Sequence, residues 1–295
     1  MLALAALLSL QAVASTPDSI VYKHTPQGKL TMYFHYPPDR NDRGKCPAIL
    51  FFHGGSWTGG GPGAFTKQAE YLASRGMVVA RVEYRLLSKH GTRPDKCVED
   101  GKSAVRWVRV HARELGVDPA RIVAAGGSAG GHVAACASLI EGFEAEGENL
   151  LVSSQPDLLV LFNPAMVTTS NSKMINIMDS RELAEALSPN SFLSRESPPM
   201  ILFFGTKDFH LRGAYETIEI ADSLGIQAEL WIAEDQGHGF FKNPPWYEWT
   251  LYLTDRFLVR HGFLADKTTI IPPDGTVMKL YQSEKDRPIR RQDPR

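Results

Sequence analysis

A serine among glycines is the first candidate for chemistry in this chain. Residues 126–130 read Gly-Gly-Ser-Ala-Gly and fit the pattern G-x-S-x-G, with Ser128 at the centre. The pattern alone recurs by chance, but here it lies between an apolar run, residues 122–125, and a helical pattern over residues 129–139. A serine on such a strand-to-helix turn has a strained backbone that needs small neighbours, and its hydroxyl lies at a helix N-terminus. Ser128 is therefore the candidate nucleophile, and a helix-capping serine in a glycine-rich turn is the alternative.

A serine nucleophile needs a general base, and nine histidines compete for that role. His238, in the sequence Gly-His-Gly-Phe, follows the last apolar run, residues 228–232, on a loop free to swing over a sheet, and we predict that it is the base. His132 follows Ser128 by four residues and should pack beside its own helix. His53 precedes two glycines and is expected to orient a loop by hydrogen bonding. The remaining candidates fall on predicted edges, loops or helix surfaces: His24, His35, His90, His111 and His261.

An acid must orient the imidazole of the base, and Asp208 is the predicted residue. It follows the apolar run of residues 200–204. Asp235 is the rival, but it is only three residues before His238, and so close a neighbour in sequence rarely aligns with the ring. We expect Asp235 to cap a loop instead. The resulting chain order of serine, aspartate and histidine, each just after an apolar run, is the order that α/β-hydrolases require.

Backbone amides and aromatic rings supply further candidate site residues. Gly54 and Gly55 follow an apolar run, and without side chains their N–H groups can approach a substrate oxygen closely. Together with the N–H of Ala129 they would form an oxyanion hole, in which each donor is worth roughly 3 kcal/mol. Trp57 comes directly after these glycines and would either stack on an aromatic acyl group or sugar ring or lie in the core beneath the loop. His210 would either face the substrate or be exposed.

These residues need a scaffold, and the hydrophobic pattern predicts one. Short apolar runs bounded by Gly, Pro or Asp read as buried strands, at residues 49–52, 78–82, 122–125, 158–162, 200–204 and 228–232. Amphipathic stretches alternate with them, most clearly over residues 94–115. This alternation predicts an α/β fold with a mostly parallel central sheet covered by helices on both faces. Residues 30–36 are expected to add an antiparallel edge strand.

From about residue 30 to about residue 263 the chain resembles the hormone-sensitive-lipase-like and feruloyl-esterase-like (acetyl esterase) branch of the serine carboxylesterases in the α/β-hydrolase superfamily. The resemblance rests on the motifs at residues 53–55, 83–86, 118–122, 126–132, 205–208 and 238–240. It implies an α/β-hydrolase fold and a carboxylic-ester hydrolase that uses no cofactor and no metal. The chain has Ser56 where relatives often carry a third glycine, and Gly127 where many lipase-like relatives have Asp. Both departures favour the feruloyl and acetyl esterase group.

The space for a lid bears on the substrate. Residues 166–199 are the only room for an insertion over the site, and their first half is polar, so we expect a rim and little or no lid domain. Activation at a lipid interface is therefore disfavoured. The preferred substrates are esters of short-chain or aromatic acyl groups, either carbohydrate-linked or on simple alcohols. An amidase, formamidase or peptidase with the same triad is the alternative, as is a catalytically weak binding protein, although the intact triad argues against the last.

Composition excludes several other classes of protein. Of the 295 residues, 43% are hydrophobic and 22% are charged, which is close to globular averages and allows a sizeable core. The net charge is −1 and no polybasic patch lies next to aromatic residues, so a nucleic-acid partner is not expected. Cys46, Cys97 and Cys136 are too few and too scattered for a disulfide scaffold or a thiolate zinc site, and at most two of them could pair.

Both ends of the chain differ from its middle. Residues 1–10 are almost purely apolar and are followed by Ala12-Val13-Ala14, so residues 1–14 are read as a signal peptide of a secreted or periplasmic protein. No Lys or Arg precedes the apolar stretch, which leaves a misplaced start or an N-terminal extension as alternatives. The stretch is too short to span a membrane. Residues 15–265 are then the catalytic domain, and residues 266–295 form a C-terminal extension whose charged end is expected to be mobile.

Overall fold

The computed structural model describes residues 18–39, 44–265, 268–275 and 277–283 of the chain. The predicted signal peptide at residues 1–14 and the charged end at residues 284–295 lie outside the described residues. Export and a mobile tail therefore stay predictions.

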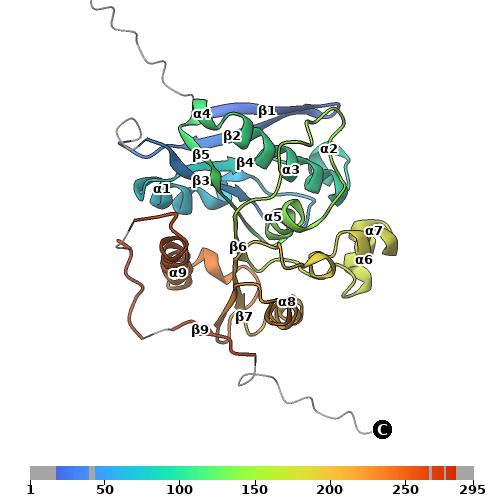
Figure 1. Ribbon diagram of the computed structural model, residues 1–295. Coiled ribbons are helices and arrows are strands. Elements are labelled where there is room, and N and C mark those ends of the chain that lie inside the picture. Colours follow the sequence, from blue (N-terminus) through green and yellow to red (C-terminus); the bar gives the residue numbers. More distant parts are fainter. Residues whose placement is uncertain (1–17, 40–43, 266–267, 276, 284–295) are drawn as a thin grey trace, which may run out of the picture.

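Strands from the whole described chain form one sheet through the centre of the molecule (Figure 1). Its order is β1-β2-β4-β3-β5-β6-β7-β8-β9. The pairs from β4 to β8 are parallel, whereas β1, β2 and β9 pair antiparallel at the two edges. The predicted, mostly parallel sheet is confirmed. The strands are β1 (Ser19–Thr25), β2 (Gly28–His35), β3 (Cys46–Phe52), β4 (Val78–Val82), β5 (Val117–Gly127), β6 (Leu158–Phe162), β7 (Met200–Gly205), β8 (Ala228–Ala233) and β9 (Lys279–Leu280).

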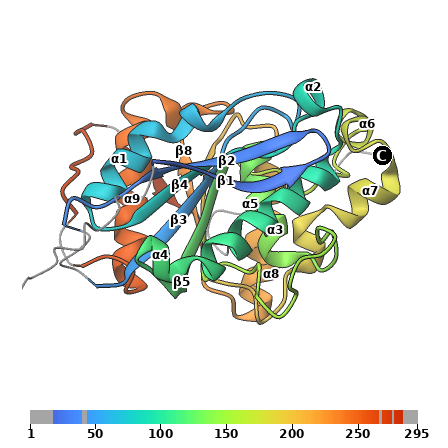
Figure 2. The ribbon, with the colours of Figure 1, turned by 90° about the horizontal axis from the view of Figure 1, so that it is seen from above.

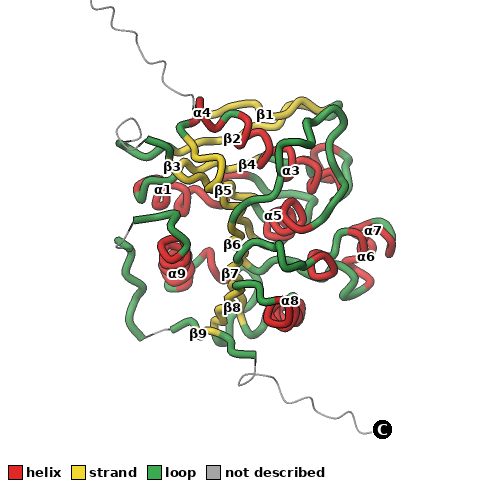
Figure 3. The backbone as a smooth tube through the Cα atoms, in the orientation of Figure 1, coloured by secondary structure: helices red, strands yellow, loops and turns green. Residues whose placement is uncertain are grey.

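Helices cover both faces of this sheet, as Figures 1 and 2 show from two directions. In the tube view of Figure 3, α1 and α9 lie on one side of the strands, and α3, α5 and α8 lie on the other. The helices are α1 (Thr66–Ser74), α2 (Leu87–His90), α3 (Pro94–Val110), α4 (Ala112–Leu115), α5 (Ala129–Leu139), α6 (Ser172–Met178), α7 (Arg181–Ala186), α8 (Leu211–Leu224) and α9 (Trp246–Arg260), with short 3₁₀ helices η1 (Pro62–Phe65), η2 (Pro189–Phe192) and η3 (Phe240–Lys242).

Strand β3 shows why the parallel strands contain continuous apolar runs. Every residue of β3 is buried. Leu50 and Phe52 belong to the core under α3, α5 and α8, whereas Ile49 and Phe51 belong to the core under α1 and α9. Successive side chains point to opposite faces of a strand, so a sheet covered on both faces needs apolar residues at every position.

The predicted strands are all present as β3 to β8, with ends that shift by a few residues, and residues 30–36 fall in the edge strand β2. Strands β1 and β9 were not predicted. β1 buries few of its side chains, and β9 is only two residues long, so neither has a strong hydrophobic pattern. The helical pattern of residues 94–115 is interrupted at His111, whose backbone leaves helical geometry with φ −93° and ψ 16°. It therefore forms two helices, α3 and α4.

The described residues contain no disulfide, and the side chains of Cys46, Cys97 and Cys136 are all buried. Nor do they contain a cluster of His, Cys, Asp or Glu that could hold a metal ion. None of the helices in this part of the chain is both long enough and apolar enough to cross a membrane.

A buried ion network fastens the antiparallel edge of the sheet to α3. Asp100 on α3 is fully buried and accepts hydrogen bonds from the backbone and guanidinium of Arg85, which follows β4, and from Lys23 on β1. Glu99 joins the network through Lys23, Arg85 and Lys96. Burial raises the pKa of Glu99, but the hydrogen bonds from Lys96, Lys23 and Arg85 outweigh it and lower the pKa to about 2.

Asp100→Asn is expected to lower the free energy of unfolding by about 3 kcal/mol, because it leaves the buried charge of Arg85 without its main partner. Lys96→Met removes only the half-exposed member of the network and should cost less than about 1 kcal/mol. Urea denaturation of both variants measures the difference. Equal losses for the two variants would contradict the importance assigned to the buried pair.

Candidate active site

Ser128 lies on a sharp turn between the end of β5 and the start of α5. Its backbone has φ 54° and ψ −121°, a region that L-residues seldom adopt. The turn needs a glycine at position 130, because the backbone of α5 packs there directly against the backbone at the end of β3. A Cβ atom on Gly130 would lie 2.1 Å from the carbonyl oxygen of Phe52 and 2.4 Å from that of His53, so only glycine fits at this position. This close approach of α5 to the end of β3 presents the serine hydroxyl at the carboxyl edge of the sheet.

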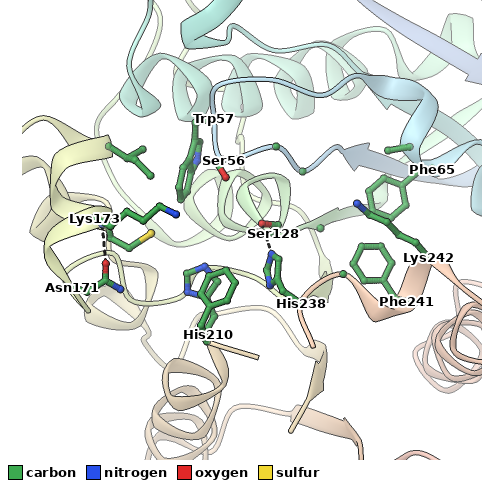
Figure 4. A pocket seen from close by; sticks show the side chains of 18 residues that line it. Ser56, Trp57, Phe65, Ser128, Asn171, Lys173, His210, His238, Phe241 and Lys242 are labelled. Atoms are coloured by element: carbon green, nitrogen blue, oxygen red, sulfur yellow. Dashed lines mark hydrogen bonds between the residues drawn. The ribbon is translucent and has the colours of Figure 1, made fainter. Parts of the chain in front are cut away.

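The three residues predicted to act together form one chain of hydrogen bonds, of which Figure 4 shows the bond between Ser128 and His238. The Nδ1 atom of His238 lies 2.9 Å from Oδ2 of Asp208, and its Nε2 atom lies 2.8 Å from Oγ of Ser128. Because a carboxylate only accepts, the ring donates from Nδ1, which leaves Nε2 to accept the serine proton. The side chain of Asp208 is fully buried, whereas that of His238 is 24% exposed. The rival, Asp235, pairs with Lys207 at 2.9 Å.

Asn163 is a residue at this site that the sequence analysis missed. It follows β6, is fully buried and has a positive φ of 48°. Its Nδ2 donates to Oδ2 of Asp208 at 2.6 Å, and its Oδ1 accepts from the N–H of Gly239 at 3.2 Å. The side chain thus joins the loop that carries the acid to the loop that carries the base. A signal existed: Asn163 directly follows a predicted strand, at the same sheet edge as Asp208 and His238.

The predicted oxyanion donors lie beside the serine. A Cβ atom on Gly54 would be 3.3 Å from Cβ of Ser128, which shows how closely this backbone approaches it. Within the described residues, no hydrogen bond is found from the N–H groups of Gly54, Gly55 and Ala129 to a protein acceptor. The ring of His53 bonds its own loop, as expected, because its Nδ1 lies 2.9 Å from the carbonyl oxygen of Gly54.

A cavity of about 570 Å³ opens over Ser128 and extends to both sides of it (Figure 4). Phe65 and Phe241 line one side, with their rings stacked 5.9 Å apart. The other side is more mixed, and its lining includes Trp57, Asn171, Lys173, Met174, Ile177, Phe209 and His210. Lys242 lines the cavity near the phenylalanine pair.

The insertion over the site differs from the polar rim that was expected. Residues 168–173 are polar, but α6 turns Met174 and Ile177 into the cavity and therefore supplies an apolar wall. The sequence pattern concealed this because α6 is only seven residues long and begins with polar side chains. The insertion remains small, consisting of α6, α7 and η2, and no separate lid domain is present among the described residues.

Trp57 is buried, as the core alternative predicts, and its stacking on a substrate stays a prediction. It is only 3% exposed, yet it lines the cavity. Its Nε1 donates to Nδ1 of His132 at 3.1 Å, and Nε2 of His132 donates to the carbonyl oxygen of Leu187 at 2.8 Å. Burial lowers the pKa of His132 to about 4, so the ring is neutral and serves as a support for Trp57, beside its helix as predicted.

His210 lines the cavity and is only 8% exposed, so the alternative that it is merely exposed is wrong, and its contact with a substrate stays a prediction. Burial and the nearby His238 lower the pKa of His210 to about 4, against the opposing effect of the Asp208 carboxylate. At neutral pH this imidazole is uncharged. Its ring lies edge-on to that of His238, with the centroids 5.6 Å apart.

A family model, BD-FAE, matches residues 34–215, a stretch that includes Gly54, Gly55 and Ser128. The chain belongs to this family. Its fold is that of the α/β-hydrolase esterases, as the sequence motifs indicated.

Curated relatives and solved structures agree with this assignment. The chain is 28% identical to a probable isoprenylcysteine alpha-carbonyl methylesterase of Arabidopsis thaliana over 75% of this chain and 50% of the relative. It is 36% identical to carboxylesterase NlhH of Mycobacterium tuberculosis over 34% of this chain and 31% of the relative. The chain spans about half the length of the plant methylesterases that it matches.

Among solved structures, the apo form of Thermogutta terrifontis esterase 2 is similar over 84% of this chain and 96% of its own, with a TM-score of 0.80 and 40% identity. The same esterase with propionate bound gives a TM-score of 0.80 and 39% identity over 85% of this chain and 96% of its own.

Asn163→Ala is expected to lower kcat for ester hydrolysis about tenfold, because the buried Asp208 loses a hydrogen-bond donor and the histidine loop loses its anchor. KM should change little, since Asn163 does not line the cavity. Asn190→Ala is the matched control: Asn190 is also buried, but it bonds Gly213 and Thr217, away from Ser128. Steady-state kinetics of both variants measures the effect, and melting temperatures check that both variants fold. Equal losses of kcat in the two variants would exclude a specific role for Asn163.

Proposed function

We propose that this protein is a serine carboxylesterase that hydrolyses esters of short-chain or aromatic acyl groups through an acyl-enzyme on Ser128. The observation that carries the proposal is the hydrogen-bond chain from Ser128 through His238 to Asp208 at the floor of an open cavity. Each of the three residues follows a strand of a parallel sheet, in the order that the α/β-hydrolase fold uses.

Each residue has a definite part in the proposed reaction. Oγ of Ser128 attacks the ester carbonyl carbon as Nε2 of His238 takes its proton. Asp208 holds the imidazole and stabilises its positive charge. The alcohol leaves with the proton from His238, and an acyl group stays on Ser128. Water then attacks the acyl carbon by the same steps and releases the acid.

The tetrahedral intermediate carries a negative oxygen that must be stabilised. The N–H groups of Gly54, Gly55 and Ala129 are the proposed donors, at roughly 3 kcal/mol each. The N-terminal end of α5 contributes its dipole at the same place. These donors are held by the backbone rather than by mobile side chains, so little reorganisation is needed during the reaction.

The cavity supports a compact substrate. Its aromatic walls, Phe65, Phe241 and Trp57, suit an aromatic acyl group or a short alkyl chain. Thermogutta terrifontis esterase 2 has been solved with propionate and with butyrate bound, and the family match of this chain supports similar acyl groups as substrates here. The proposal has two further parts: the substrate's alcohol is carbohydrate-linked, and the protein is exported from the cell. The export signal at residues 1–14 can be tested by mass spectrometry of the N-terminus of the mature protein.

Ser128→Ala is expected to lower kcat for a short-chain ester on the order of 10⁶-fold while the melting temperature stays near that of the unmodified protein. A fluorophosphonate probe should label the native serine and not the variant. If the variant kept near-native turnover, Ser128 would not be the nucleophile. Labelling without turnover of any ester would favour an amidase or a binding protein instead.

A series of p-nitrophenyl esters of increasing acyl length tests the acyl preference. We expect kcat/KM to be highest for short or aromatic acyl groups and to fall beyond about eight carbons, because added methylenes contribute about 0.8 kcal/mol each only where an apolar wall buries them. The walls offered by Met174 and Ile177 on one side and by Phe65 and Phe241 on the other are short. A maximum at long chains, with a jump in rate above the micelle concentration, would make the protein a lipase.

A further inference from the structure

The charges around the cavity over Ser128 are unbalanced. Two lysines, Lys173 and Lys242, line it, whereas none of its lining residues is Asp or Glu. Asp208 lies behind the imidazole of His238 with a fully buried side chain and does not line the space. The other nearby ring, His210, is neutral because burial lowers its pKa to about 4. The formal charges on the residues that line the cavity are therefore all positive, and apolar walls limit the water that screens them.

The two lysines differ in what holds them. The ammonium of Lys242 lies 5.9 Å from the centre of the Phe241 ring, an arrangement in which the ring itself attracts the charge. For Lys173, the described residues supply neither a carboxylate nor an aromatic ring as partner. Asp179, the acid that follows α6, is occupied by Arg93 at 2.8 Å. Lys173 is an exposed residue at the rim of the cavity, and Figure 4 shows its amino group directed toward the cavity.

The surroundings of Lys173 show what kind of group would fit there. Met174 and Ile177, from the same helix as Lys173, line the cavity. Asn171 and His210 lie on the same side of Ser128 as Lys173 (Figure 4). A substrate on this side would pass its methylenes along Met174 and Ile177 and bring a polar end to the lysine. A lysine favours an anion, as a compact point charge, and the neighbouring amide and imidazole can donate further hydrogen bonds.

We propose that Lys173 binds an anionic group of the substrate, so that this protein prefers esters that carry a carboxylate a few carbons from the ester bond. The proposal rests on the esterase function given above and adds a substrate class to it. Half-esters of dicarboxylic acids carry such a charge on the acyl side, and acetyl esters of hydroxy acids carry it on the alcohol side. In either substrate the charge is distant from the carbonyl carbon and takes no part in the bond changes.

The test compares each anionic ester with a neutral ester of the same length. Monoethyl esters of dicarboxylic acids are paired with ethyl esters of simple fatty acids, and acetyl esters of hydroxy acids are paired with acetyl esters of plain alcohols. Titration of the released acid gives kcat/KM for all four groups. We expect one anionic group to exceed its neutral partner about tenfold at its best length, which is about 1.4 kcal/mol. Which group is preferred shows whether the acyl or the alcohol half lies beside Lys173.

Variants then assign the preference to the residue. Lys173→Met should reduce the ratio of anionic to neutral kcat/KM about tenfold, and Lys173→Arg, which keeps the charge, should retain most of it. Lys89→Met on α2 is the matched control, because Lys89 is an exposed lysine that does not line the cavity, and it should leave the ratio unchanged. The preference should also weaken with added salt, since the screening length falls from about 30 Å at 0.01 M to about 3 Å at 1 M.

The outcomes separate this proposal from the esterase function on which it rests. Turnover of the neutral esters that is lost in Ser128→Ala supports the esterase function whatever the lysine does. Given that turnover, equal rates for anionic and neutral partners would overturn the role of Lys173. A preference that survives in Lys173→Met but disappears in Lys242→Met would also overturn it, since the anion would then lie on the phenylalanine side of the cavity.

Discussion

The arrangement of the site depends on how one buried carboxylate is satisfied. The side chain of Asp208 has no access to water, and a buried charge is costly unless hydrogen bonds surround it. Its oxygens accept from Nδ2 of Asn163, from Nδ1 of His238 and from the backbone N–H of His210. These donors come from the loops after β6, β8 and β7. Satisfying the charge therefore fixes the relative positions of three loops, and the base is aligned with Ser128 as a result.

Much of this arrangement follows from local sequence patterns. Strands β3, β6 and β7 contain no charged residue, and β4, β5 and β8 contain apolar runs, because both faces of the sheet are covered; such runs are easy to find in the sequence. Ser128, Asp208 and His238 each come directly after such a strand, so chain order and the parallel topology together bring them to one edge. The choice of Asp208 over Asp235 also agrees with the structure, because Asp235 pairs with Lys207.

Other features have no local signal. Asn163 acts through two hydrogen bonds to distant parts of the chain, one to Asp208, 45 positions away, and one to Gly239, 76 positions away. An asparagine after a strand is common in turns of every kind, so the residue type did not indicate this role. The apolar wall of α6 depends on which side of a seven-residue helix faces the cavity, and so short a helix has too little periodicity to show it. Strand β1 buries little of its own surface and is held by Lys23 in the network with Asp100. Long-range contacts decide all three cases.

Helix α6, which forms one wall of the cavity, belongs to the connection between β6 and β7. The nucleophile, the acid and the base all lie outside that connection. The part of the selectivity that α6 provides is thus encoded in a different stretch of the gene from the three reactive groups. Related enzymes could exchange or lengthen the stretch between β6 and β7 and acquire new substrates while their reactive groups stayed in register. The exchange would have to begin after Asn163, because that residue belongs to the connection by position but to the reactive groups by its contacts.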